Sequence, residues 1–503
     1  MKTDVLVIGG GLSGRLCAQT ASEECEVTLV SDGNGASPYI HGINIPLDKR
    51  DSVEIFTEDT LKSGRYICDK KLVDILCKGS LDITEEYCFD KKDGEYALLQ
   101  PVGSSYPRVA GIGGRTGACI MTDINRSKSF FELKQTRATE LIVKDNTVIG
   151  ARLYDKNKNK FFSVYAKAVV LATGGFGGIF PFSTNSSDIG GDGIAMAYNA
   201  GAALCDMEFI QFEPSAAVYP PSLRGKSIIT TMFYEGAVLR NKYGDRFTDE
   251  KVNKDELAVA IFNEVAKGNG TENGGVYFDM TAVPKNLLTN QYKDYYNRYI
   301  NAGIDISQTP VEVSAAPHTT LGGVRINEKC ETSVHGLFAC GEVAGGIHGA
   351  NRLGGNAGLE VLVFGKLAGK SAAAYAKTAK HNFFEQSDEP LAYTADTNEI
   401  EDMRRELESA SKELGVIRNG KGLMKAISVA DTIISKTKSR NSFMSRCLYN
   451  DALCLYISLN CALYRKSSIG CHIREDSIAE NKSYRVIARS VNGKLSMGKE
   501  NVI

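Results

Sequence analysis

The sequence Asp4-Val-Leu-Val-Ile-Gly-Gly-Gly-Leu-Ser-Gly14 joins a short apolar run to a glycine-rich turn. An apolar run of this length is typical of a buried parallel strand, and residues Arg15–Ser22 have helical character. Glu26–Val30 supplies a second apolar run at the distance that a strand–helix–strand unit requires. This order of strand, glycines, helix and strand predicts a Rossmann-like α/β fold at the N-terminus.

The glycines of this turn fit the fingerprint of a dinucleotide-binding site. Gly9 permits the tight turn, Gly11 lets the backbone approach a pyrophosphate, and Gly14 lets the helix pack closely against the strand. The motif alone is weak, but its place between a strand and a helix indicates bound FAD or NAD. The acidic residue that usually binds the ribose is missing from the end of the second strand, because Ser31 stands there and Asp32 follows.

A second glycine-rich segment, Ala339–Glu360, runs directly into an apolar stretch that begins at Leu359. We interpret it as a loop that opens a helix. A helix start offers unpaired N–H groups and the positive end of the helix dipole, so it can bind an anion or an electron-rich ring edge. Arg352 can hold a carboxylate with two parallel hydrogen bonds. A structural turn with a surface arginine is the alternative interpretation. The polar side chains of the loop are Glu342, His348, Asn351, Arg352 and Asn356.

Length and composition describe a globular chain with more than one domain. A chain of 503 residues is too long to fold around a single ordinary hydrophobic core, so we expect two or three domains. The formal net charge of −1 gives no electrostatic reason to expect nucleic acid or an anionic membrane as a partner. No apolar run reaches the roughly 18 residues of a membrane span. We therefore expect a cytoplasmic protein that does not itself span a membrane.

The thirteen cysteines include no C-x-x-C pair. This spacing argues against an iron–sulfur or zinc site held by the chain, so no metal ligands are predicted. Buried, reduced thiols in a reducing compartment are the expected state.

Shifts in composition divide the chain. A helical run is expected from Val53 to Tyr87, and Lys167–Gly177 is a buried strand that ends in glycines. From about Met207 to Thr309 the glycine motifs lapse while Tyr, Lys, Asn and Asp increase, which indicates an inserted domain. Beyond about residue 395, apolar residues recur at helical spacing. The expected domains are 1–206 and 310–395 for the two parts of the dinucleotide-binding domain, 207–309 for the insertion and 396–503 for a helical C-terminal domain.

Together these motifs resemble the flavoprotein subunits of succinate dehydrogenase and fumarate reductase, and L-aspartate oxidase. The resemblance is close to full length, and seven motifs occur in the same order. It implies a two-dinucleotide-binding FAD domain interrupted by a mobile α+β capping domain, with substrate held between them. The motifs are Gly9 to Gly14, Ala172-Thr-Gly-Gly-Phe-Gly177, Gly191-Asp-Gly193, Met207-Glu-Phe-Ile-Gln-Phe212, His318-Thr-Thr-Leu-Gly-Gly323, His348-Gly-Ala-Asn-Arg-Leu-Gly-Gly-Asn356 and Arg465-Lys-Ser-Ser-Ile-Gly-Cys-His-Ile-Arg-Glu-Asp476.

The resemblance also implies which residues bind FAD. Glu342 would hold the ribityl or ribose group, Asp192 another polar part of the cofactor, and the helix after Asn356 would face the pyrimidine edge of the flavin. A helix N-terminus at that edge stabilises the negative charge of reduced flavin. The implied cofactor-binding residues are Gly9, Gly11, Leu12, Ser13, Gly14, Ser31, Ser37, Gly42, Thr173, Gly174, Asp192, Glu342, Asn356 and Leu359.

Four further residues are the implied catalytic and substrate-binding groups, and two of them depart from the family pattern. His318 and Arg352 would bind a substrate carboxylate. Glu213 stands where the family has a substrate-binding His, and it would repel a second carboxylate unless it were protonated or paired. Lys254 stands at the position of the proton-donating Arg and is the candidate acid.

Two more positions differ from the family. The relay Glu and Arg correspond to Thr230 and Phe233. The histidine that carries covalent FAD in membrane-bound members corresponds to Gly35 or Ala36, so we expect noncovalent FAD. For His41 and His472, structural roles are favoured.

The leading hypothesis is an FAD-dependent oxidoreductase that moves hydride between flavin N5 and a carbon–carbon bond beside a carboxylate, with a carboxylic acid as substrate. The alternatives are L-aspartate oxidase and a non-enzymatic electron-transferring flavoprotein subunit. The helical C-terminal domain is compatible with an iron–sulfur or other redox subunit as partner.

Overall fold

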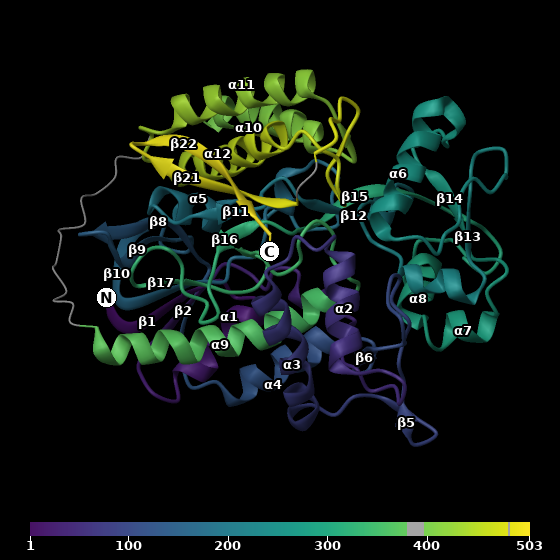
Figure 1. Ribbon diagram of the computed structural model, residues 1–503, viewed down its shortest axis with the longest axis horizontal. Helices are drawn as coiled ribbons and strands as arrows, with labels where there is room; N and C mark the ends of the chain where they lie inside the picture. Colours follow the sequence, from purple (N-terminus) through teal and green to yellow (C-terminus); the bar gives the residue numbers. More distant parts are fainter. Residues whose placement is uncertain (380–396, 481–482, 503) are drawn as a thin grey trace.

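The computed structural model describes residues 1–379, 397–480 and 483–502, and Figure 1 shows their arrangement. The expected boundary between residues 395 and 396 lies outside these ranges. A large sheet with its helices forms the body, a smaller sheet with short helices lies at one side, and a group of helices with a strand hairpin covers another face (Figure 1).

The main sheet is built around the apolar runs that the sequence pattern predicts to be strands. Its central strand β1 pairs in parallel with β2 and β10, β2 pairs in parallel with β7, and β10 pairs in parallel with β17. The antiparallel strands β9 and β8 complete the other edge. The strands are β1 (Lys2–Ile8), β2 (Val27–Ser31), β7 (Phe131–Lys134), β8 (Thr136–Lys144), β9 (Thr147–Asp155), β10 (Lys160–Leu171) and β17 (Leu337–Ala339).

The register aligns the carboxyl ends of the parallel strands. Ile8 is paired with both Val30 and Leu171, and Leu171 is paired with Ala339. The glycine-rich turns that follow these strands therefore meet at one edge of the sheet, where open α/β sheets bind their ligands.

Two helices that start in those turns pack against each other on the sheet. They are α1 (Leu12–Ala21) and α9 (Asn356–Thr378), and both contribute to one continuous hydrophobic core with β1, β2 and β10. The glycine loop that ends at residue 355 thus opens a helix.

The expected helical run from Val53 to Tyr87 is two helices. They are α2 (Val53–Ser63) and α3 (Lys70–Glu86). The break begins at Gly64, where an added Cβ would lie 2.1 Å from Cys68 Sγ, and Arg65 and Tyr66 follow with positive φ. The tight turn brings His348 O against Gly64, so tertiary packing overrides the helical pattern of the sequence.

The inserted region folds around an antiparallel sheet in the order β12-β15-β14-β13. It has a separate hydrophobic core, which runs from Ala217 to Val313. A bulge separates Glu213 from Ala216 in the pairing of the two long strands. The elements are β12 (Ile210–Ala217), β13 (Val238–Arg240), α6 (Lys254–Glu264), β14 (Val276–Asp279), α7 (Lys285–Thr289), α8 (Lys293–Asn301) and β15 (Val311–Thr320).

The C-terminal region is a helical layer followed by a strand hairpin. The helices are α10 (Thr397–Ser411), α11 (Gly420–Thr437) and α12 (Phe443–Tyr464), and the hairpin is β21 (Tyr484–Val491) with β22 (Lys494–Asn501). β21 pairs with β11 (Leu204–Cys205), so the end of the chain adds strands to a sheet begun by the first half. α12 also packs on α5 (Asp192–Asn199), which starts at the ligand edge of the main sheet.

Candidate active site

A cavity of about 570 Å³ lies at the carboxyl edge of the main sheet and extends to the inserted domain. It brings together all four predicted catalytic residues, Glu213, Lys254, His318 and Arg352. Ten of the predicted cofactor residues also line it: Gly9, Gly11, Leu12, Ser13, Ser37, Gly42, Thr173, Gly174, Asp192 and Glu342.

Two of the predicted cofactor residues, Gly14 and Ser31, do not line the cavity. An added Cβ on Gly14 would lie 2.0 Å from Gly9 O, so Gly14 is required for close packing of α1 on the sheet. Ser31 is turned away, because its hydroxyl donates to Glu132 Oε1 at 2.9 Å. Asp32 lines the cavity in its place and is paired with Lys156.

The other two predicted cofactor residues that do not line the cavity, Asn356 and Leu359, belong to the start of α9. Asn356 is fully buried, and its Oδ1 accepts from Asn44 Nδ2 at 2.6 Å while its Nδ2 donates to Thr60 Oγ1 at 3.1 Å. Leu359 lies in the main core. The start of α9 nevertheless borders the cavity through Ala357 and Gly358. The polar groups that α9 offers to a ligand at this point therefore belong to the backbone, and the side chains of Asn356 and Leu359 do not take part.

Among the described residues, three helices begin at this cavity, and each has a glycine as its N-cap residue. The N-cap residues of α1, α5 and α9 are Gly11, Gly191 and Gly355, and none accepts a hydrogen bond from the first turn through a side chain. Ser37 Oγ accepts from the backbone N–H of Leu12 at 2.8 Å at the start of α1. The three positive dipole ends converge on one space. Such a space suits a ligand with phosphates and an electron-rich ring.

Side-chain atoms also face the cavity without partners. Ser13 Oγ, Thr173 Oγ1 and Arg352 Nε are buried and have no hydrogen-bond partner among the described residues. A buried polar atom left unpaired is costly, so a polar ligand is expected to satisfy these three. At Gly11, an added Cβ would lie 3.0 Å from Ser37 Oγ, so the glycine leaves room for the hydrogen bond that Ser37 Oγ accepts from the backbone N–H of Leu12. These features fit FAD.

Asp192 is held from two sides at the start of α5. Arg137 Nη2 lies 2.6 Å from Asp192 Oδ2, and Asn450 Nδ2 donates to Asp192 Oδ1 at 2.7 Å. The Asp192 carboxylate raises the pKa of the Arg137 guanidinium. Asp451 Oδ1 accepts from the backbone N–H of Gly191 at 3.0 Å. The C-terminal helix α12 therefore positions a residue of the ligand edge.

Glu342 follows the strand β17 and bonds with the end of β15. Its Oε1 accepts from the backbone N–H of Thr320 at 3.0 Å. Burial raises the pKa of Glu342 above its usual value. The carboxyl oxygens of Glu342 can accept hydrogen bonds from the hydroxyl groups of a ligand.

Glu213 and Lys254 form an ion pair at the junction of the two domains. Lys254 Nζ lies 2.6 Å from Glu213 Oε2, and Ser215 Oγ lies 2.8 Å from Glu213 Oε1. Burial would raise the pKa of Glu213, but the Lys254 ammonium and the hydrogen bond from Ser215 outweigh it and hold the pKa below its usual value. The carboxylate is thus ionised and neutralised, which removes the repulsion that an unpaired Glu213 would exert on an acidic substrate.

His318 and Arg352 are the other two predicted catalytic residues in the cavity. Burial is the main cause that lowers the pKa of His318 to about 3, so the imidazole is neutral near pH 7. Its Nδ1 lies 2.7 Å from Thr184 Oγ1. Arg352 is 6% exposed and, within the described residues, has no carboxylate at ion-pair distance. Burial lowers its pKa below the usual value. A buried guanidinium without an anion is a ready site for a ligand carboxylate.

The relay positions carry no charge. Thr230 lines the cavity, whereas Phe233 is buried in the core of the inserted domain and stacks on Phe278 at 4.7 Å between ring centres. Phe233 has no atom that can carry a proton, so the relay that the resemblance implies is not present at that position.

Many lining residues were not among the predicted site residues, and three of them join the inserted domain to the main sheet domain or lie beside that contact. Tyr295 and Arg298 lie on α8, and His41 lies before β3 (Gly42–Asn44). Tyr295 Oη is 2.9 Å from His41 Nε2, which joins the inserted domain to the main sheet domain. No motif surrounds Tyr295 or Arg298, and the proximity of Gly42 is the one signal that could have drawn attention to His41. His472, by contrast, is fully buried next to Arg418, in keeping with a structural role.

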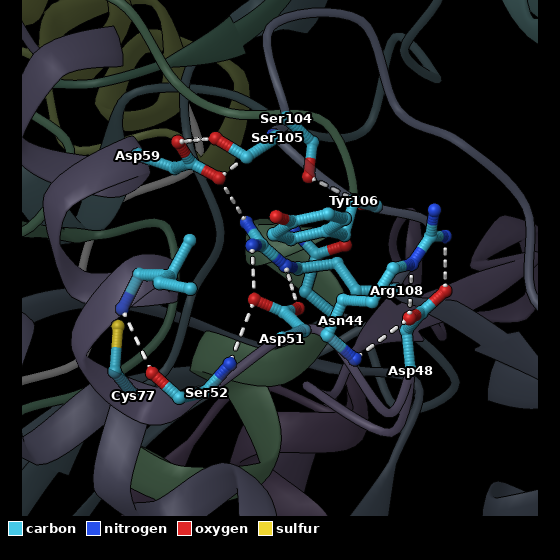
Figure 2. Close-up of polar contacts among 12 residues, drawn as sticks. Asn44, Asp48, Asp51, Ser52, Asp59, Cys77, Ser104, Ser105, Tyr106 and Arg108 are labelled. Carbon is cyan, nitrogen blue, oxygen red and sulfur yellow. Dashed lines mark hydrogen bonds and ion pairs between the residues drawn. The ribbon is translucent and has the colours of Figure 1, made fainter.

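A buried arginine, Arg108, joins two aspartates from different segments next to the cavity lining (Figure 2). Arg108 donates to both oxygens of Asp51 at 2.8 Å and to Asp59 at 2.7 Å. Ser105 also binds Asp59 through its backbone N–H and its hydroxyl. This network fixes the loop that places Leu99, Pro101, Val102 and Val109 in the cavity wall.

Within the described ranges, His, Cys, Asp and Glu side chains form no cluster of three that could bind a metal ion. No helix in those ranges combines the length and apolar character that crossing a membrane requires.

Residues 4–357 match the model of a family described as an FAD binding domain. An uncharacterized FAD-dependent oxidoreductase of Methanocaldococcus jannaschii is 36% identical over 96% of this chain and 95% of its own length. A subunit of fumarate reductase (CoM/CoB) from Methanothermobacter marburgensis is 34% identical over 94% of each chain. Among solved structures, Mycobacterium smegmatis Sdh1 in complex with UQ1 superposes with a TM-score of 0.85 and 27% identity, covering 100% of this chain and 94% of the other.

Proposed function

Because the chain belongs to the FAD-binding domain family of oxidoreductases, which includes a subunit of fumarate reductase (CoM/CoB), we propose that it exchanges hydride between FAD and the carbon–carbon bond of a carboxylic acid bound in the cavity. It is an FAD-dependent oxidoreductase of the fumarate reductase type. FAD, when bound, supplies the atom that accepts or donates the hydride.

The residues around the cavity would divide the cofactor among them. The start of α1, with Gly9, Gly11 and Ser13, would bind the pyrophosphate. Glu342 and Asp192 would bind hydroxyl or other polar groups, and the start of α9 would stabilise negative charge on the reduced ring. We propose noncovalent binding, since neither Gly35 nor Ala36 offers an atom for attachment.

One observation carries the assignment of the substrate class. Arg352 is a buried cation in a cavity, beside neutral His318 and, among the described residues, without a carboxylate of its own. Arg352 would bind the substrate carboxylate through its planar fork, and His318 would add a neutral hydrogen bond. Lys254 would donate a proton from Nζ to the substrate carbon next to the one that receives the hydride, and Glu213 would keep that ammonium aimed into the cavity.

The test is Arg352→Lys in the FAD-loaded protein. Lysine keeps the charge but lacks the fork, so we expect kcat/KM with an unsaturated carboxylic acid and an artificial electron donor to fall about 100-fold or more. FAD content should stay unchanged. Arg489→Lys, at an exposed position of β21, is the matched control. Full efficiency in Arg352→Lys would move the carboxylate site elsewhere.

Two further proposals concern the setting of the enzyme. The similarity to a protein named as a subunit supports a partner redox subunit, iron–sulfur or other, that passes electrons to or from FAD. All thirteen cysteines are unpaired, and ten are buried, which supports a reducing compartment such as the cytoplasm. Neither nucleic acid nor a membrane is proposed as a direct partner of this chain.

A further inference from the structure

The ion pair between Glu213 and Lys254 has a titratable neighbour that leads away from it. Lys254 Nζ and His318 Nε2 lie 2.6 Å and 3.8 Å from the same atom, Glu213 Oε2. Among the described residues, these are the Lys, Arg and His side chains within 4.0 Å of the Glu213 carboxylate. The other oxygen accepts from Ser215 Oγ at 2.8 Å, and Ser215 is fully buried beside Ile228 O. Of these contacts, His318 is the one that can pass a proton to the pair from outside.

The second nitrogen of the His318 ring contacts a segment that reaches the surface. Its Nδ1 lies 2.7 Å from Thr184 Oγ1. Thr184 is half-buried at the cavity wall, and residues 186–188 of the same segment are exposed. An imidazole that accepts a proton at one nitrogen and releases one at the other moves positive charge across its ring. A line of polar groups therefore leads from this segment to the candidate acid, through Thr184, His318, Glu213 and Lys254.

The charge on Lys254 controls whether His318 can hold a proton. Burial lowers the pKa of His318, and the positive charges of Lys254 and Arg352 lower it further. The Glu213 carboxylate raises it, and the balance is a pKa of about 3. Once Lys254 has given its proton to the substrate, one of these positive charges disappears while the carboxylate remains. The pKa of His318 then rises, and the imidazolium is attracted across the 3.8 Å gap to Glu213.

We propose that Thr184 and His318 form a proton relay that recharges Lys254 through Glu213 after each turnover. The N–H bond of Lys254 breaks as the C–H bond of the product forms. When the product carboxylate has left His318, Nε2 releases a proton to Glu213, which passes it to the Lys254 amine. Water at the Thr184 end returns a proton to the imidazole, so one solvent proton replaces the one delivered and no electrons are exchanged. The relay rests on the proposed function, in which Lys254 is the acid.

The coupling of the charges is tested without turnover. Isotope-labelled histidine reports the titration of each of the six imidazoles by NMR in the FAD-loaded protein, and His318→Asn identifies the signal. In the wild type, His318 should stay neutral from about pH 5 to 9. In Lys254→Met, which mimics the uncharged lysine, His318 should titrate within this range. The double variant Lys254→Met with Glu213→Gln should return it to the neutral state, because the attracting carboxylate is gone.

Thr184→Val tests the outer link of the relay. With an unsaturated carboxylic acid and an artificial electron donor, kcat should fall about 10-fold or more while KM changes less than about 2-fold. Imidazole added at constant pH should raise kcat of this variant but not of the wild type, because imidazolium supplies the missing proton. Thr184→Ser keeps the hydroxyl and should restore kcat. Ser183→Ala, which removes a hydroxyl bonded to Pro317 O at 3.1 Å in the same segment, is the matched control and should keep wild-type kcat.

Three results would overturn the relay. They are a neutral His318 in Lys254→Met, wild-type kcat in Thr184→Val, which would mean that water in the cavity recharges Lys254 directly, and a loss in Thr184→Val that imidazole does not relieve, which would make Thr184 a structural group. Any of them together with turnover of an unsaturated acid by the wild type would keep the oxidoreductase. Titration of His318 in Lys254→Met, without turnover of any unsaturated acid by the wild type, would keep the coupling between the two side chains and refute the catalytic proposal.

Discussion

Glu213 and Lys254 are the two catalytic positions at which the sequence is expected to depart from the family pattern, and in the structure they form an ion pair. A glutamate alone at this position would oppose an acidic substrate, and a lysine alone would be a buried cation at the start of α6, where the helix dipole is unfavourable. Their 2.6 Å contact resolves both problems. The same contact holds the candidate proton donor at the cavity wall.

Lys254→Met tests that role. If Lys254 delivers the proton, reductase activity should fall about 100- to 10,000-fold, the range that a positioned acid contributes. FAD binding should persist. Since the change also leaves Glu213 buried without its cation, the double variant Lys254→Met with Glu213→Gln serves as the control for charge imbalance. Equal losses in both variants would assign the effect to the missing acid, whereas wild-type activity in either would eliminate Lys254.

Asp206 provides a prediction about pH dependence. It is 1% exposed, and in the described structure neither carboxylate oxygen has a hydrogen-bond partner. Burial, with a contribution from Glu208, raises the pKa of Asp206 to about 7. Between the ordinary value of 3.8 and about 7, the folded state therefore binds a proton that the unfolded state has lost. The stability from this group is complete below pH 3.8 and is lost as pH rises to about 7.

Asp206→Asn removes this titration. The free energy of unfolding of the variant, minus that of the wild type, should rise by about 1.4 kcal/mol per pH unit from pH 5 to 7 and then level off. Denaturant titrations across this range measure the difference. Asp82→Asn, at an exposed position on α3, should show no such trend. A flat difference for Asp206→Asn would show that the carboxyl is ionised throughout.

At the scale of elements, local chemistry was enough to predict the parts of the site that come from the parallel strands. Gly9, Gly11 and Gly14 have roles set by their own backbone, so their spacing indicates strand, turn and helix before any long-range contact is known. Asn356 was placed correctly at a helix start, but its side chain bonds with Asn44 and Thr60, which are about 300 residues away in the sequence. Such a contact has no local signal.

The inserted domain shows the same limit more strongly. Arg298 and Tyr295 belong to a short helix of ordinary composition, and they reach the cavity only because α8 lies against the segment that contains Ser227. The helix break at Gly64 likewise depends on His348 from the distant glycine loop. The last strand hairpin pairs with β11 of the first half, which a pattern of apolar spacing cannot show. The position of α8 at the cavity, the helix break at Gly64 and the pairing of the last hairpin all depend on tertiary contacts.

Over the whole molecule, the C-terminal helices complete the ligand edge that the N-terminal sheet begins. α12 contacts the start of α5 through Asn450 and Asp451, and the hairpin joins the same half of the chain through β11. The layer seen above the sheet in Figure 1 therefore supports the start of α5 at the ligand edge. If Asp192 binds FAD as proposed, the affinity for FAD should depend on Asn450, which lies more than 250 positions from Asp192.

Asn450→Ala tests this dependence. The change removes the 2.7 Å hydrogen bond to Asp192 Oδ1 and a 3.2 Å bond to Thr139 O, so the Asp192 carboxylate loses one of the two groups that orient it. Because a hydrogen bond to a charged group contributes roughly 1.5 to 3 kcal/mol, we expect FAD affinity to fall about 10- to 100-fold. Retained flavin is measured after gel filtration and acid precipitation, and noncovalent FAD should appear in the supernatant. Asn460→Ala, on the same helix but bonded to Tyr456 O, should keep the wild-type FAD content. If both variants retain FAD equally, Asp192 is positioned by Arg137 alone; if flavin stays with the precipitate, the cofactor is covalent.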